Sequence, residues 1–66
     1  MDFTEKARMQ IEHWIRHNED HLQEYETFAH ELEIAGKKDS AGYIREMAAL
    51  MVKSNDRLVM ALRFLD

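Results

Sequence analysis

The strongest constraint on the fold is a single break in an otherwise continuous helical pattern. Proline is absent, and the segment "AGKKDS", residues 35–40, holds the only cluster of turn-forming residues. Gly36 can adopt the left-handed backbone that ends a helix. Asp39 or Ser40 can then accept hydrogen bonds from the first free N–H groups of a second helix. The sequence therefore predicts two helices joined by one short turn.

Hydrophobic residues recur at steps of three and four residues on both sides of this break, as in amphipathic helices. Before it they are Ile11, Trp14, Leu22, Tyr25, Ala29 and Leu32. After it they are Ile44, Met47, Ala48, Met51, Leu58, Ala61, Leu62 and Leu65. We expect one domain over 1–66, with a helix over about 3–34, a turn over 35–39 and a helix over about 40–65. The short connection makes the helices antiparallel neighbours in an all-α hairpin.

Each hydrophobic stripe contains one asparagine, Asn18 in the first and Asn55 in the second. If the hairpin folds about the turn, residues whose numbers add to about 73 lie level with each other. Asn18 and Asn55 satisfy this sum and are predicted to meet halfway along the hairpin. Buried polar pairs of this kind fix the register of helical interfaces.

The second helix is hydrophobic on more than one side, because Leu50, Met60 and Phe64 lie off its main stripe. A helix of that kind needs more than one packing partner. A chain of 66 residues also buries only a small core, and without cysteine it cannot gain stability from disulfides. We therefore expect a homodimer that forms a four-helix bundle, with a different protein as the alternative partner. Met60 and Phe64 would suit either, because methionine-rich surfaces adapt to varied partners.

Charge and composition exclude several functional classes. The net charge of −4 argues against nucleic acid as a partner. No apolar run approaches the roughly 20 residues needed to span a membrane. The start "MDFTEKARMQ" lacks the apolar segment of a signal peptide, so we expect a cytoplasmic protein. A hairpin offers no concave pocket for catalysis. The di-iron bundle motif Glu-x-x-His needs a glutamate three residues before a histidine, and no histidine here has one, so we expect no enzyme.

The segment "HWIRHNEDH", residues 13–21, places His13, His17 and His21 four residues apart. On a helix, two histidines at this spacing can clasp one metal ion. Asp56 lies level with His17 and could add a carboxylate ligand. We therefore expect a metal site among His13, His17, His21 and Asp56, for a divalent transition ion such as Ni²⁺ or Zn²⁺.

Two other interpretations of the same residues stay open. His17 and Asp56 could form an ordinary hydrogen bond between the helices, beside an Asn18–Asn55 pair that only sets the register. The protein would then be a structural or protein-interaction module. Alternatively, protonation of the histidines could loosen the packing, which would make the segment a pH-sensitive seam.

The segments "HWIRHNEDH" and "LQEYETFAHEL", followed by "AAL" and the late Asn55, resemble a family of short, uncharacterised helical-hairpin proteins. The first helix of that family reads HW-I-x-H-N-x-x-H, which His13, His17, Asn18 and His21 match. The resemblance covers about residues 11–65. It implies a link with nickel-handling or carbon monoxide dehydrogenase-related proteins of anaerobes, and it marks these residues as the ones to test. The sequence thus predicts a non-enzymatic accessory protein.

Overall fold

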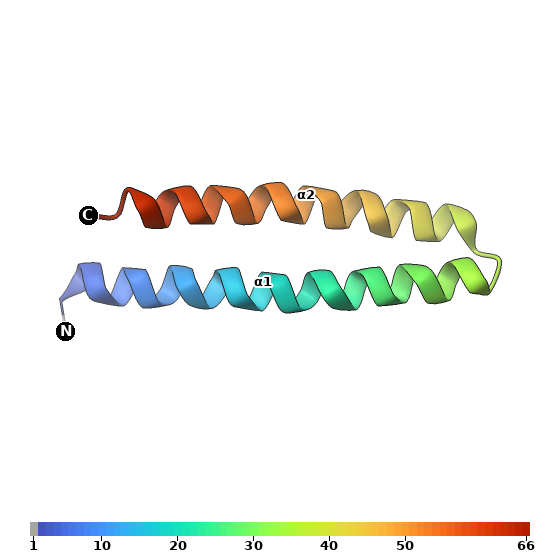
Figure 1. Cartoon of the computed structure of the whole chain (residues 1–66), viewed down its shortest axis with the longest axis horizontal. Coiled ribbons are helices and arrows are strands. Elements are labelled where there is room, and N and C mark those ends of the chain that lie inside the picture. Colours follow the sequence, from blue (N-terminus) through green and yellow to red (C-terminus); the bar gives the residue numbers. More distant parts are fainter. Residues whose placement is uncertain (1) are drawn as a thin grey trace.

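The computed structural model describes residues 2–66 and contains two helices, α1 (Phe3–Ile34) and α2 (Lys38–Arg63). They lie side by side and antiparallel, so that the start of α1 and the end of α2 are neighbours at one end of the hairpin (Figure 1). The hairpin measures 51 × 17 × 10 Å. The prediction of an all-α two-helix hairpin is confirmed. Neither described helix is long and apolar enough to cross a membrane.

The turn between the helices is closed by the backbone around Gly36. Gly36 has a φ of 82°, a left-handed conformation that glycine adopts without strain. Lys37 N donates to Leu32 O at 2.8 Å, and Gly36 N donates to Glu33 O at 3.0 Å. These two hydrogen bonds form a Schellman motif, which satisfies carbonyl groups left free at the end of α1. The turn therefore needs only three residues.

Because the turn is so short, α2 begins at Lys38, before the predicted start. Lys37 occupies the N-cap position and makes no side-chain capping hydrogen bond, so the prediction of Asp39 or Ser40 as the cap is wrong. Asp39 instead lies within the first turn of α2, where the positive end of the helix dipole stabilises its negative charge. At the start of α1, Asp2 does act as a cap, because its side chain accepts from Glu5 N at 2.9 Å.

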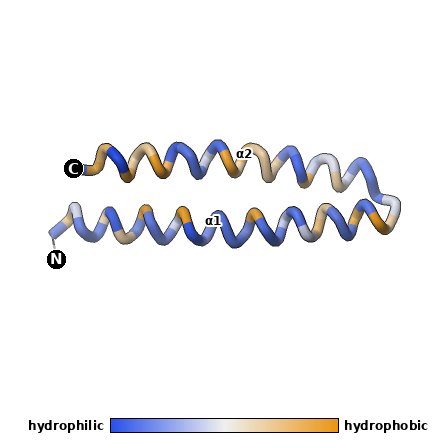
Figure 2. The backbone as a smooth tube through the Cα atoms, in the orientation of Figure 1, coloured by the Kyte–Doolittle hydropathy of each residue, from blue (hydrophilic) through white to orange (hydrophobic). Residues whose placement is uncertain are grey.

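The helices meet along one seam in which contact residues recur every three and four positions. On α1 the part-buried or buried seam residues are Thr4, Arg8, Ile11, Ile15, Asn18, Leu22, Tyr25, Ala29 and Leu32. On α2 and just beyond it they are Ala41, Ile44, Ala48, Met51, Asn55, Leu58, Leu62 and Leu65. Hydrophobic and hydrophilic residues accordingly alternate along both helices (Figure 2).

The seam is too narrow to form a closed core. Within residues 2–66, only Ala29 and Ala41 are buried hydrophobic residues, and no large side chain is fully buried. Trp14, which the hydrophobic pattern places on the seam, is 48% exposed. A single hairpin therefore leaves much of its hydrophobic surface in contact with water.

Candidate functional site

The centre of the seam is a polar layer made by Asn18 and Asn55. Asn18 Nδ2 donates to Asn55 Oδ1 at 2.9 Å, and Asn55 Nδ2 donates to the Ile15 carbonyl at 3.2 Å. Asn55 is only 8% exposed. The structure therefore brings together Asn18 and Asn55, the two asparagines that the sequence predicts to lie level with each other.

This layer fixes how the helices are aligned. A slip of one helix along the other would separate the two amides and leave them buried without partners. Each buried polar group without a partner costs about 1–3 kcal/mol. No buried side-chain nitrogen or oxygen within residues 2–66 lacks a partner in the observed register. The pair therefore selects this alignment over its neighbours.

Beside the polar layer, the imidazoles of α1 form a row. The closest contact joins His17 Nε2 and His21 Nε2, which are 2.9 Å apart. His13 stacks on His17 with ring centroids 5.9 Å apart. His21 stacks on Tyr25 at 5.9 Å, and its Nδ1 lies 3.1 Å from Glu24 Oε2. The structure thus brings His17 and His21 together and holds His21 from both sides.

These contacts favour one arrangement of the ring protons. An ionised carboxylate can only accept a hydrogen bond, so the contact with Glu24 requires the proton of His21 on Nδ1. When that ring is neutral, its Nε2 has a free lone pair, to which Nε2–H of His17 can donate. A carboxylate that holds Nδ1–H of a histidine is the usual support of a metal-binding imidazole. The contact with Glu24 thus holds His21 in the tautomer whose Nε2 could act as a ligand atom.

The separation of the two Nε2 atoms suits a shared ion. Histidine nitrogens bind zinc at about 2.0–2.1 Å, so two of them at a right angle lie about 2.9 Å apart, and two at the tetrahedral angle about 3.3 Å apart. The observed distance is 2.9 Å. Both geometries are therefore reached by small ring rotations. An ion at this position would replace the hydrogen bond and would require the proton of His17 on Nδ1.

The other predicted ligands are not part of this cluster. Asp56 is exposed on α2, where it borders a shallow hollow with Lys53, Ser54 and Arg57. No hydrogen bond or ion pair among the described residues joins it to His17 or His21. Within residues 2–66, no group of three or more His, Asp or Glu side chains is placed to hold a metal ion. One chain thus offers two ligand atoms, one from each of His17 and His21.

One edge of the seam, which we call the glutamate side, is filled by charges. Arg45 pairs across the seam with Glu33 and, at 3.6 Å, with Glu26. The hydrogen bond from Arg45 lowers the pKa of Glu33 below its ordinary value, and the same contact raises the pKa of Arg45. Sequence reasoning missed this feature, although glutamates recur every seven residues along α1: Glu5, Glu12, Glu19, Glu26 and Glu33.

The opposite edge, which we call the histidine side, is hydrophobic at both ends and polar in the middle. On α1 it carries Trp14, His17, His21, Glu24 and Phe28, and on α2 Tyr43, Met47, Leu50, Ser54, Arg57, Ala61 and Phe64. Of the predicted interface residues, Leu50 is 66% and Phe64 75% exposed, whereas Met60 is half-buried. This side therefore holds most of the unpartnered hydrophobic surface near the histidines.

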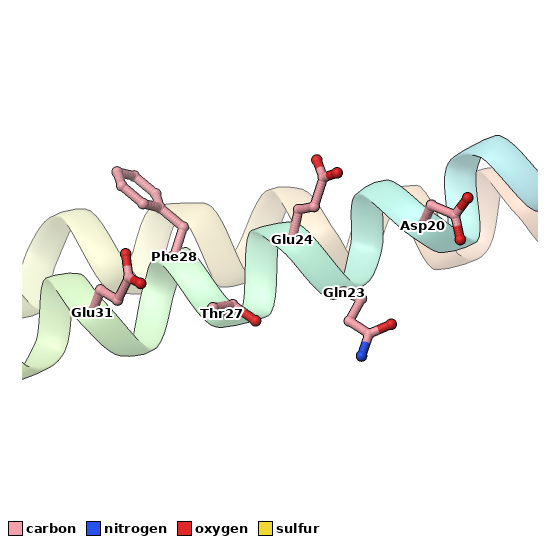
Figure 3. A pocket seen from close by; sticks show the side chains of 6 residues that line it. All are labelled: Asp20, Gln23, Glu24, Thr27, Phe28 and Glu31. Carbon is pink, nitrogen blue, oxygen red and sulfur yellow. The ribbon is translucent and has the colours of Figure 1, made fainter.

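Two open hollows lie along α1 on either side of the histidine pair. One is lined by Asp20, Gln23, Glu24, Thr27, Phe28 and Glu31, and in it Phe28 and Glu24 project from the same edge of the helix (Figure 3). The other, nearer the start of α1, is lined by Phe3, Lys6, Ala7, Gln10, Ile11 and Trp14. Both expose an aromatic ring, since Trp14 is 48% and Phe28 51% exposed.

Comparison with known proteins assigns no activity to these features. Neither the curated proteins nor the solved structures include a significant match to the chain. A family model described as a domain of unknown function, DUF8180, matches residues 7–65, and the chain therefore belongs to that family.

Proposed function

We propose that the protein is a non-enzymatic accessory module that binds a transition-metal ion through Nε2 of His17 and Nε2 of His21. The observation that carries this proposal is the 2.9 Å separation of those two atoms. The contact between Glu24 and Nδ1 of His21 supports it, because it leaves the ligand nitrogen free of a proton. The module would hold or deliver the ion without carrying out a reaction.

Imidazole ligands suit Zn²⁺, Ni²⁺, Co²⁺ and Cu²⁺. The affinities of these ions for a nitrogen site follow the same general order in most proteins, so two histidines alone do not select one of them. Ni²⁺ belongs among the ions to test because the sequence resemblance implies a link with nickel-handling proteins. His13 and Asp56 stay predicted additional ligands. They would have to move toward the pair to join it.

The proposal includes self-association. The chain exposes 5239 Å², whereas a folded monomer of 7.9 kDa exposes about 4,400 Å². The excess of about 800 Å² is the area that one partner buries in a standard interface. A second copy packed on the histidine side would cover Trp14, Phe28, Leu50 and Phe64 and complete a four-helix bundle.

The test is thermal unfolding of untagged protein with and without Zn²⁺. An ion that binds only the folded state at a hundred times its Kd stabilises that state by about 2.7 kcal/mol. We expect the midpoint of unfolding to rise for the wild type. His17→Gln and His21→Gln should abolish the rise, because each removes one of the two ligand atoms.

His30→Gln is the matched control, since His30 is an exposed histidine on the same helix outside the row. It should leave the response to Zn²⁺ intact. An equal loss of response in His30→Gln would mean that the ion binds the surface without a defined site. A wild type that does not respond to Zn²⁺, Ni²⁺ or Co²⁺ would contradict the proposal.

A second candidate function rests on the Asn18–Asn55 hydrogen bond. That contact is sufficient to set the register of a purely structural or protein-interaction module, in which His17 and His21 only bond to each other. Such a module would show no response to metal ions. Its variants Asn18→Ala and Asn55→Ala would weaken association as well as folding, and His17→Gln would affect neither.

A further inference from the structure

The histidine pair alone is an incomplete metal site. Zinc in protein sites is almost always bound by four ligands, of which a structural site takes all from the protein. His17 and His21 supply two nitrogens, and within residues 2–66 of a single chain no third His, Asp or Glu side chain is placed to share an ion with them. With the side chains of one chain placed as they are, completing the site with protein ligands requires another chain.

The position of the pair along the hairpin suggests where those ligands come from. α1 runs from Phe3 to Ile34, so its midpoint falls between Asn18 and Glu19. At 1.5 Å per residue, His17 and His21 lie on either side of this midpoint, each within about 4 Å of it along the helix axis. If a two-fold axis passes beside the midpoint of α1, the midpoint of α1 in one copy lies opposite the midpoint of α1 in the second copy.

We propose that two copies of this chain pack through their histidine sides, with α1 antiparallel to α1 of the second copy and the loops at opposite ends. This inference rests on the proposed metal-binding function. His17 and His21 of both chains then surround one ion on the two-fold axis. The dimer binds one ion through four imidazole nitrogens, which is one ion for every two chains.

The distribution of hydrophobic residues agrees with this arrangement. Toward the open end of the hairpin the histidine side carries Trp14 and Phe64, and toward the turn it carries Phe28 and Leu50. All four are more than two-fifths exposed in the single chain. In the dimer they pack on both sides of the central histidines, and they exclude water from the ion.

Charge distinguishes this arrangement from one in which α1 packs against α2 of the second copy. In that alternative, Arg57 lies level with His17, and its positive charge would face the bound ion. In the arrangement we propose, two copies of α1 meet, each with eight acidic and three basic residues between Phe3 and Ile34. Their repulsion opposes association, and a divalent cation on the axis offsets it. Association in this arrangement should therefore depend on the ion.

The test combines sedimentation velocity and native mass spectrometry of untagged protein titrated with Zn²⁺. We expect the ion to raise the fraction of dimer, and the dimer to carry one Zn²⁺. Co²⁺ bound at the same stoichiometry should give the intense visible absorption of a tetrahedral site. His17→Gln should remove all three effects, whereas His30→Gln should preserve them, because His30 is an exposed histidine of α1 that lies outside the row.

The possible failures are distinct. Two ions per dimer, or one ion on each monomer, would overturn the shared site and leave the proposed function of each histidine pair intact. Weak octahedral Co²⁺ absorption at one ion per dimer would overturn the closed tetrahedral site, because a six-coordinate ion carries ligands besides the four imidazoles. Absence of any bound ion would overturn both this inference and the proposed function.

Discussion

The two edges of the helix seam use opposite chemistry. On the glutamate side, Arg45 of α2 forms ion pairs with Glu26 and Glu33 of α1. These charged groups are therefore paired within the chain. On the histidine side, Trp14 and Phe28 stay about half exposed and the imidazoles bond mainly to each other. The first edge stabilises the hairpin itself. The second leaves its hydrophobic side chains and imidazoles at least partly exposed.

The largest effect should come from a charge placed on the histidine side. Leu50→Asp would bury an unpaired carboxylate in the proposed dimer, and a charge of this kind costs about 3–5 kcal/mol. We expect the dissociation constant of the dimer to rise by at least about a hundredfold. Sedimentation velocity over a concentration series measures this change.

Val52→Asp is the matched control for that variant. Val52 is a neighbouring exposed hydrophobic residue, but it lies on the glutamate side. It should leave the dimer unchanged, because that edge stays in water. Equal weakening by the two variants would mean that the difference between the edges does not direct association.

A smaller effect is expected where the two edges meet, at the polar layer. Asn55→Ala leaves the Asn18 amide without its acceptor and removes the hydrogen bond to the Ile15 carbonyl. We expect a loss of about 1–3 kcal/mol in the free energy of unfolding, measured with denaturant. Replacing both asparagines with leucine should recover much of that loss, since neither amide is then left unpaired. A double variant as unstable as the single one would contradict this account.

Much of the fold follows from local sequence signals, because helix periodicity and a glycine stop depend on neighbouring residues. The alignment of Asn18 with Asn55 also follows, since one short turn fixes the level of every residue. The start of α2 does not follow from local signals, because the Schellman motif at Gly36 ends the turn before Asp39 can cap the helix. The four-residue spacing places His17 and His21 next to each other, but the sequence does not give the orientations of their rings. Those orientations depend on side-chain rotation and on the contact between His21 and the carboxylate of Glu24.

The smallest effect concerns the ion pair on the glutamate side. Arg45 lowers the pKa of Glu33, so this pair stabilises the fold at pH values above the ordinary pKa of glutamate. The stabilisation is lost as the pH falls through the lowered pKa of Glu33. Glu33→Gln should therefore slightly lower the unfolding midpoint at about pH 7 and have a smaller effect at about pH 2.

The dimer should persist in Glu33→Gln, because the substituted side chain faces away from the proposed interface. Thermal unfolding at the two pH values and sedimentation velocity measure the two outcomes. A destabilisation that is the same at both pH values would show that the charge of Glu33 is not its cause.

The most direct test of the central claim is nuclear magnetic resonance of the histidine ring nitrogens before and after addition of Zn²⁺. Before addition, we predict a proton on Nδ1 of His21 and on Nε2 of His17. After addition, Nε2 of both rings should show the shift of a metal-bound nitrogen, with the protons on Nδ1. Unchanged spectra of His17 and His21 in the presence of the ion, or a response of His30 instead, would contradict the account.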